Sequence, residues 1–253
     1  MLTNLQTRDI ETLVHPYTNL AVHREVGPLV LERGKGVFLY DTSGKEYIEG
    51  LAGLWCASLG YANEELVEAA AAQMRKLSFT HLFGGRSHDP AIELAEKLKE
   101  IAPFEASKVF FTSSGSEAND TQMKLAWYMS NALGKTKKKK IIARIKGYHG
   151  VTIASASLTG LPANHTDFDL PIANVLHTAC PHYYRLGKDG ESEEAFTDRM
   201  IADYGEWDRR NRCGCRSHSS WTGRCSHHRR SGHTHHQNHT QCILCGKNAF
   251  YSQ

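Results

Sequence analysis

A glycine flanked by serines is the first feature of this sequence that could do chemistry. Ser114, Gly115 and Ser116 lie between a short apolar segment and a stretch with helical spacing. A helix that begins after a strand presents unpaired N–H groups and a partial positive charge, which together hold a phosphate. Gly115 lets the backbone come close to a ligand, and the serine hydroxyls add donors. The same residues also fit a simpler interpretation, in which Ser114 caps the helix and Gly115 makes a turn.

Aromatic side chains at two further places could contact a flat ligand. Tyr148 and His149 lie between glycines after an apolar run, where the phenol ring could stack and the imidazole could hydrogen-bond. Trp55 lies in the glycine-punctuated stretch GLWCASLGY, where an exposed indole could line a pocket. The alternatives are a buried tyrosine beside a satisfied histidine in a turn, and a tryptophan packed in the core.

Strand patterns precede or surround these residues. Residues 34–50 predict a β-hairpin with its turn at Asp41–Gly44, residues 107–114 predict a buried strand, and residues 141–145 predict a second short strand. Strands that alternate with helices form parallel sheets, so we expect an α/β domain. In such a domain ligands gather at the carboxyl ends of the strands.

Three helices are predicted between the strands. The first begins after Asn63 as its N-cap, and the second has Asp89 as its N-cap and Pro90 at the first helical position. The third is expected from Ser116 to Leu133. Its apolar residues share one face at helical spacing: Ala118, Leu125, Ala126, Met129 and Leu133.

The overall composition is that of a soluble globular chain. It has 253 residues, of which 40% are hydrophobic and 23% charged, with a formal net charge of +3. That charge is too small to indicate nucleic-acid binding, and the lysines at 137–140 predict a solvated loop. No apolar run approaches the roughly 20 residues that cross a bilayer, and the N-terminal residues lack a signal-type apolar core. We therefore expect a cytoplasmic protein with neither a nucleic acid nor a membrane as partner.

The composition changes near Tyr204. Five of the seven cysteines and seven of the 15 histidines follow this residue, with almost no valine, isoleucine or leucine. Cys242 and Cys245 have the spacing of a zinc site, so residues 205–253 could bind metal, or they could be a disordered basic extension. The interpretation that we favour is a shifted reading frame, since excess Arg, Cys, His, Ser and Gly is what shifted codons give in GC-rich DNA. A one-base shift over residues 208–215 can encode an apolar strand.

Four stretches of the sequence point together to one family. They are GLWCASLGY, FFTSSGSEANDTQMKLAWYM, GYHGVTIASASLTGLP and TACPHYYRLGKDGESEEAF. In this order and spacing they resemble the class III aminotransferases, the ω-amino acid/pyruvate transaminases that use pyridoxal 5′-phosphate (PLP). The resemblance covers roughly residues 17–203. The Ser-Gly-Ser-Glu-Ala-Asn-Asp and Gly-Tyr-His-Gly motifs are more specific as a pair than either is alone.

The resemblance implies the type I PLP-dependent transferase fold, an α/β fold with a mostly parallel sheet in its large domain. Residues 1–60 would be the N-terminal segment of the small domain, with the β-hairpin, and residues 61–204 part of the PLP-binding large domain. Enzymes of this fold are usually homodimers with the active site at the interface, so we expect a homodimer for the full-length family. The substrates would be a small-molecule amine or ω-amino acid and an oxo acid such as pyruvate.

The resemblance also implies how the cofactor would be bound. Ser114, Gly115 and Ser116 would bind the phosphate group of PLP through main-chain N–H and hydroxyl groups. Tyr148 would stack on the pyridine ring, with His149 beside it.

The remaining positions concern substrate and catalysis. Trp55 would face the substrate, and Phe83 resembles the loop that reaches a neighbouring subunit's site. The family's chemistry also needs a lysine that holds PLP as a Schiff base and an aspartate that keeps the pyridinium protonated. Both lie beyond the region of resemblance, the sequence has no Asp-Glu-Val, and Lys247 beside Asn248 is taken as a coincidence. We therefore assign no catalytic residue and no metal site.

These observations predict a truncated transaminase. We expect the isolated 253-residue chain to be inactive and poorly soluble, and to form no stable PLP complex. Two alternatives stay open, namely a non-catalytic fragment and a protein that binds metal through its Cys/His tail.

Overall fold

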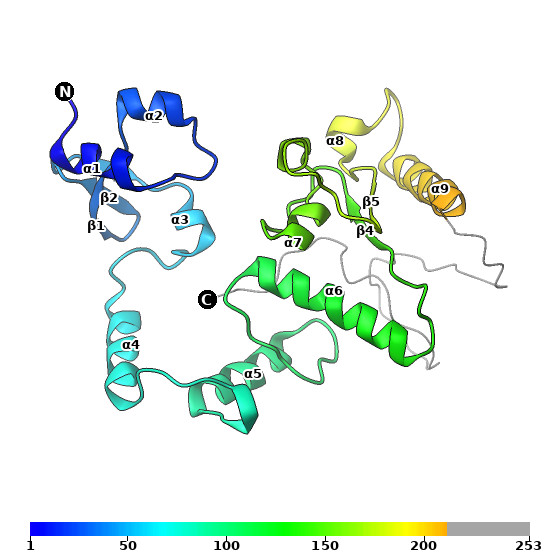
Figure 1. Ribbon diagram of the computed structural model, residues 1–253, viewed down its shortest axis with the longest axis horizontal. Coiled ribbons are helices and arrows are strands. Elements are labelled where there is room, and N and C mark those ends of the chain that lie inside the picture. Colours follow the sequence, from blue (N-terminus) through cyan, green and yellow to red (C-terminus); the bar gives the residue numbers. More distant parts are fainter. Residues whose placement is uncertain (212–253) are drawn as a thin grey trace. The chain divides into compact units, whose positions relative to one another are not determined.

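The computed structural model describes residues 1–211 (Figure 1). The chain divides into two compact units, one spanning Met1–Ser107 and one beginning at Lys108. Each unit has its own small sheet, antiparallel in the first and parallel in the second. The domain boundaries expected at residues 60 and 204 refer to the family's domains and stay a prediction.

The first unit contains a three-stranded antiparallel sheet with short helices before and after it. Its elements are, in order, α1 (Asn4–Thr12), α2 (Leu20–Val26), β1 (Leu31–Lys35), β2 (Phe38–Asp41), β3 (Glu46–Ile48), α3 (Ala52–Trp55), α4 (Glu64–Lys76), η1 (Phe83–Gly85) and α5 (Asp89–Ile101). The predicted hairpin is confirmed, because β2 pairs with β3 and Phe38 lies opposite Ile48. Its turn is closed by the Asp41 carboxylate, which accepts hydrogen bonds from the N–H groups of Ser43 and Lys45 at 2.9 and 3.1 Å.

The starts of α4 and α5 test the capping rules. Asn63 caps α4 as predicted, since its side-chain oxygen accepts a hydrogen bond from Leu66 N–H at 3.2 Å. The prediction for α5 is wrong by one residue, because His88 is the N-cap and Asp89 is already helical. The Asp89 carboxylate lies 3.2 Å from Lys76 Nζ, so it pairs with α4 rather than with the first N–H groups of its own helix.

The second unit is built around a parallel pair of strands. Its elements are α6 (Gly115–Ala132), β4 (Ile141–Arg144), α7 (Ile153–Leu158), η2 (Pro162–Asn164), β5 (Val175–Thr178), α8 (Tyr183–Leu186) and α9 (Glu193–Asn211). β4 and β5 pair in parallel, and α7 packs against both strands and against α6. The core consists of Met123, Ala143, Leu158 and Val175, with Trp127 packed against it. A mixed α/β unit with a parallel strand pair is the expected fold class.

One prediction for this unit is wrong. Residues 107–114 do not form a strand, and Phe110 is exposed, because no described strand lies beside them to complete a hydrogen-bonded ladder. The predicted helix is confirmed as α6, and Leu125 and Leu133 of its apolar face are exposed. Met123 and Ser130 are the buried residues of this helix.

The tail begins within α9, which continues past Tyr204 to Asn211. The interpretations of the tail as a zinc module, a basic extension or a shifted frame concern residues that lie outside the described ones, as do Cys242, Cys245 and Lys247.

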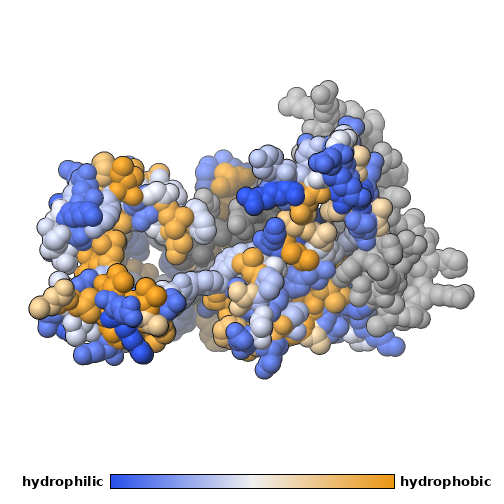
Figure 2. Space-filling model, turned by 90° about the horizontal axis from the view of Figure 1, so that it is seen from above, coloured by the Kyte–Doolittle hydropathy of each residue, from blue (hydrophilic) through white to orange (hydrophobic). Residues whose placement is uncertain are grey.

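Apolar side chains lie on the surface of α4 and α5. Among the exposed ones are Leu66, Val67, Met74, Ile92, Leu94 and Ile101. Figure 2 shows that hydrophobic residues also lie among hydrophilic ones on the face that it draws. Large exposed apolar patches favour association, which supports the expectation of poor solubility. Within the described part of the chain, no helix combines the length and apolar character that a membrane span requires.

A paired carboxylate in the second unit predicts a dependence of stability on pH. Arg199 Nε and Nη2 each lie 2.8 Å from an oxygen of Glu191. The Arg199 guanidinium, assisted by the Lys188 N–H, lowers the pKa of Glu191 from 4.5 to about 2. Because this pKa is depressed in the folded chain, the pair stabilises the fold above pH 4.5 and loses that contribution as the pH falls toward 2. The urea midpoint of Glu191→Gln should fall below that of the parent by an amount that is largest near pH 6 and shrinks toward pH 3.

The exposed residue Glu100, which pairs with Lys97 in the first unit, supplies the control. We expect Glu100→Gln to change the urea midpoint little at any pH. A difference between parent and Glu191→Gln that stays constant from pH 6 to pH 3 would contradict the role given to the ion pair.

Candidate functional site

The beginning of α6 is capped by Ser114. Its hydroxyl oxygen accepts a hydrogen bond from Glu117 N–H at 3.1 Å, and its carbonyl accepts one from Ala118 N–H at 3.0 Å. Ser114 thus has the capping position that the simpler interpretation expects. Its role toward a ligand stays a prediction.

Two backbone donors remain open at this helix start. Within the described chain, the N–H groups of Gly115 and Ser116 make no hydrogen bond. A methyl group added at Gly115 would meet no atom within 4 Å, so the first turn is accessible. The nearby Glu117 carboxylate already accepts a hydrogen bond from Ser113 N–H at 2.8 Å. The positive end of an 18-residue helix therefore offers two free donors to an anion.

The loop with the Gly-Tyr-His-Gly motif lies directly against this helix start. Ser116 Oγ accepts a hydrogen bond from Val151 N–H at 3.0 Å, and Asn119 Nδ2 donates one to the carbonyl of His149 at 2.6 Å. The approach is close, because a Cβ at Gly150 would lie 2.4 Å from Ser116 Oγ. The structure thus brings together the two segments that the sequence singled out separately.

A polar network behind this contact fixes α7 to α6, and sequence reasoning missed it. Asp120 Oδ1 accepts hydrogen bonds from the hydroxyls of Thr152 and Ser155 at 2.8 and 2.7 Å. Ser155 Oγ also lies 2.8 Å from the Ser116 carbonyl. The available signal was spacing, since Ser116 and Asp120 are four residues apart on α6, and Thr152, the N-cap of α7, is three residues before Ser155.

Removing the buried hydroxyl of this network should be costly. Ser155 is fully buried, so Ser155→Ala leaves the Asp120 carboxylate with one hydrogen-bond donor fewer. We expect a loss of about 1–3 kcal/mol in the free energy of unfolding, measured by urea denaturation. Thr166→Ala removes an exposed hydroxyl of the same unit and should cost less than about 0.5 kcal/mol. Equal losses for the two variants would contradict the structural role of the network.

Tyr148 and His149 differ in environment. Tyr148 is 54% exposed, and its ring makes no hydrogen bond or ring contact with the described residues, so the alternative of a buried tyrosine is wrong. The His149 side chain is half-buried, and the backbone N–H of His149 donates a hydrogen bond to Thr159 Oγ1 at 2.9 Å. Burial, together with the charge of His177, lowers the pKa of the His149 imidazole. The loop therefore offers an uncovered phenol ring beside a neutral imidazole.

Trp55 and Phe83 belong to the first unit and are both exposed, by 69% and 84%. The core-packing alternative for Trp55 is therefore wrong in the described chain. Trp55 ends a left-handed turn, with a φ angle of +70°, in the segment Ala52–Trp55. Non-glycine residues in this region are strained, and such strain is concentrated at functional sites. The substrate-binding roles of Trp55 and Phe83 stay predictions.

Comparison with known proteins identifies the family. A sequence model of the family Aminotransferase class-III matches residues 20–212. Gamma-aminobutyrate transaminase 1, mitochondrial, from Oryza sativa subsp. japonica is 52% identical over 189 residues, which cover 74% of this chain and 37% of the relative. Vanillin aminotransferase from Capsicum frutescens is 52% identical over 177 residues, covering 70% and 39%.

Solved structures agree with the sequence relatives. The omega transaminase from Pseudomonas jessenii in complex with PMP has a TM-score of 0.80 and 55% sequence identity, over 82% of this chain and 46% of that chain. This match confirms the predicted α/β fold. The chain spans well under half the length of the two curated relatives given above. The family match extends over most of the chain, which therefore belongs to the class III aminotransferases.

Proposed function

We propose that this chain carries the cofactor-binding part of a PLP-dependent transaminase. The full protein would transfer an amino group from an amine or ω-amino acid to pyruvate or a similar oxo acid. The observation that carries the proposal is the open first turn of α6, with free N–H groups at Gly115 and Ser116, held against the loop at Tyr148. Relatives named as gamma-aminobutyrate, vanillin and omega transaminases support the reaction class.

The residues present fit a phosphate-bearing pyridine cofactor. Two unpaired N–H donors at a helix start, with open space at Gly115, suit a phosphate group. The exposed ring of Tyr148 suits a face of a flat heterocycle, and the neutral imidazole of His149 adds no charge beside it. PLP, when bound, supplies an electron sink for the carbon that carries the amino group. Ser116 and Asn119 would hold the two binding segments in register.

Further parts of the proposal rest on the family alone. We place Trp55 and Phe83 on the substrate side, and we propose that the full-length protein is a homodimer. Cytoplasm remains our proposed location, although relatives named mitochondrial or chloroplastic make organelles the alternative. The Asp-Glu-Val strand and the Schiff-base lysine are not found by sequence pattern, so we assign no catalytic residue to this chain.

A phosphate-dependent but weak interaction with PLP is the expected result of a binding test. Titration of the 253-residue chain at low micromolar concentration should show reversible binding of PLP that inorganic phosphate displaces. Pyridoxal, which lacks the phosphate, should bind at least tenfold more weakly, because the helix start then has no anion to bind. Gel filtration should remove the ligand, and no amino-group transfer should be detected with ω-amino acids and pyruvate.

Two results would contradict this picture. Equal affinities for PLP and pyridoxal would exclude the phosphate site at α6. A yellow protein in which borohydride attaches the cofactor to one lysine would show that a Schiff-base residue lies in this chain after all.

A further inference from the structure

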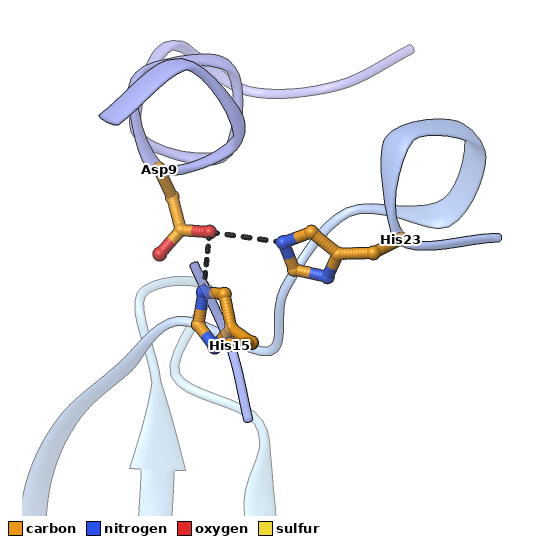
Figure 3. A group of neighbouring side chains, drawn as sticks. All are labelled: Asp9, His15 and His23. Atoms are coloured by element: carbon orange, nitrogen blue, oxygen red, sulfur yellow. Dashed lines mark hydrogen bonds and ion pairs between the residues drawn. The ribbon is translucent and has the colours of Figure 1, made fainter. Parts of the chain in front are cut away.

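A compact group of metal-ligating side chains lies in the first unit, in residues that the transaminase site does not use. We name Asp9, His15 and His23 the N-terminal His–Asp cluster (Figure 3). His15 Nε2 lies 2.8 Å and His23 Nε2 lies 3.1 Å from the same oxygen, Asp9 Oδ1. Figure 3 shows the two imidazoles converging on this carboxylate from different segments of the chain.

The backbone around the cluster is fixed by local interactions. Asp9 lies on α1, whose start is closed by a capping box between Thr3 and Gln6. The Gln6 side chain donates a hydrogen bond to the Pro28 carbonyl at 3.0 Å, which ties α1 to the segment after α2. His23 lies on α2, whose first turn is capped by Asn19. Two of the three ligand groups, Asp9 and His23, are thus held by short, capped helices, and His15 lies in the segment that joins them.

The cluster has the donor set and the spacing of a metal site. Two imidazole nitrogens and one carboxylate oxygen are ligands that zinc accepts, with a fourth position left for water. Metal–ligand bonds of about 2.0–2.2 Å in a tetrahedron place the ligand atoms about 3.3–3.6 Å apart. The three atoms here all lie within 4.8 Å of one another, so small side-chain movements would admit an ion.

Burial favours a built site over a chance surface contact. The side chains of His23, Asp9 and His15 are only 9%, 16% and 33% exposed. To bind a divalent ion through Nε2, each neutral imidazole would carry its single proton on Nδ1, so that the ion takes the place of the two hydrogen bonds to Asp9 Oδ1. The partial exposure of His15 leaves a path for the ion from solvent.

We propose that the N-terminal His–Asp cluster binds a divalent transition-metal ion, with zinc as the expected ion. The ion would join α1, the His15 segment and α2. This site lies in the first unit and is independent of the proposed transaminase function.

The test is zinc stoichiometry in the full chain without a polyhistidine tag. Zinc bound per chain is measured by equilibrium dialysis at micromolar zinc for the parent and for Asp9→Asn, which retains a hydrogen-bond acceptor but loses the charge. His15→Ala, at the most exposed member, is the second variant. His88→Ala is the matched control, since His88 lies in the same unit and its side chain makes no capping bond. The double variant Cys242→Ser/Cys245→Ser removes two cysteines of the tail, and so distinguishes zinc bound by them from zinc bound by the cluster.

We expect Asp9→Asn and His15→Ala to lose one equivalent of zinc, or to bind it at least tenfold more weakly. His88→Ala and the double cysteine variant should retain that equivalent. Cobalt added to the parent should give visible absorbance of a nitrogen/oxygen site that Asp9→Asn abolishes. Circular dichroism of the metal-free proteins shows whether each variant folds. Undiminished zinc in both cluster variants, or its complete loss in the cysteine variant, overturns the proposal.

Discussion

The substitution Gly160→Ala is expected to destabilise the second unit by about 3 kcal/mol or more. A Cβ at this buried position would lie 2.1 Å from the Arg144 carbonyl oxygen and 2.7 Å from Ile145 Cα. Both are backbone atoms at the end of β4, so no side-chain rotation relieves the overlap. The backbone of Gly160 also bonds to Lys146 and Gly147, which prevents it from moving away.

The substitution should also disturb the candidate site, because Gly160 is hydrogen-bonded to Lys146 and Gly147, the two residues that precede Tyr148. Small domains retain about 5–15 kcal/mol in total, so the loss should appear as a large fall in the urea midpoint and in soluble yield. Gly115→Ala is the matched control, since a methyl group there meets no atom within 4 Å and φ is not positive. If the free energy of unfolding of Gly160→Ala lies within about 1 kcal/mol of the parent's, the backbone at the end of β4 can move to accommodate the methyl group.

What the sequence could predict was local. The Asn63 cap and the turn at Asp41 follow from rules that involve a few neighbouring residues, and the structure confirms both. The predicted Asp89 cap is wrong by one residue, and that carboxylate pairs instead with Lys76, thirteen residues away. No local pattern reveals that partner, and local patterns place helix boundaries only to within one or two residues.

Packing partners decided the other outcomes. A run such as residues 107–114 becomes a strand only if another strand offers its backbone groups, and within the described chain none does. Likewise, the core face of α6 depends on where β4 and α7 lie. Met123, rather than Leu125, therefore contacts the core. Amphipathic spacing gives the helix but not the identity of its covered face when both faces carry apolar residues.

The candidate site depends both on local sequence rules and on contacts between segments that are far apart in the sequence. Local physics left the Ser114–Ser116 turn open between a cap and a phosphate site, and the structure shows that a cap at Ser114 and free donors at Gly115 and Ser116 coexist. That the loop at His149 lies beside this turn was implied only by the family resemblance. The bond from Asn119 to the His149 carbonyl spans thirty residues, so no local pattern could indicate it.

Gly150→Ala should impair cofactor binding as well as stability. A Cβ there would lie 2.4 Å from Ser116 Oγ and 2.8 Å from Ser155 Cβ, and the φ angle of +129° disfavours any side chain. Backbone strain and overpacking together predict a loss of about 2–5 kcal/mol in the free energy of unfolding. Relief of the overlap requires Ser116 to move from the Val151 N–H, which separates the loop from the open turn of α6.

In the proposed site, the loop and the helix start would act as one anion site only while that bond holds. The affinity of Gly150→Ala for PLP should therefore fall at least tenfold under conditions in which the variant remains folded. Gly190→Ala is the matched control, because its φ of +75° imposes strain but a methyl group meets nothing within 4 Å. It should lose about 1–2 kcal/mol of stability and keep the parent's affinity. If both variants bind PLP equally well, contact between the two segments is not what forms the phosphate site, and the donors of α6 must act without the loop.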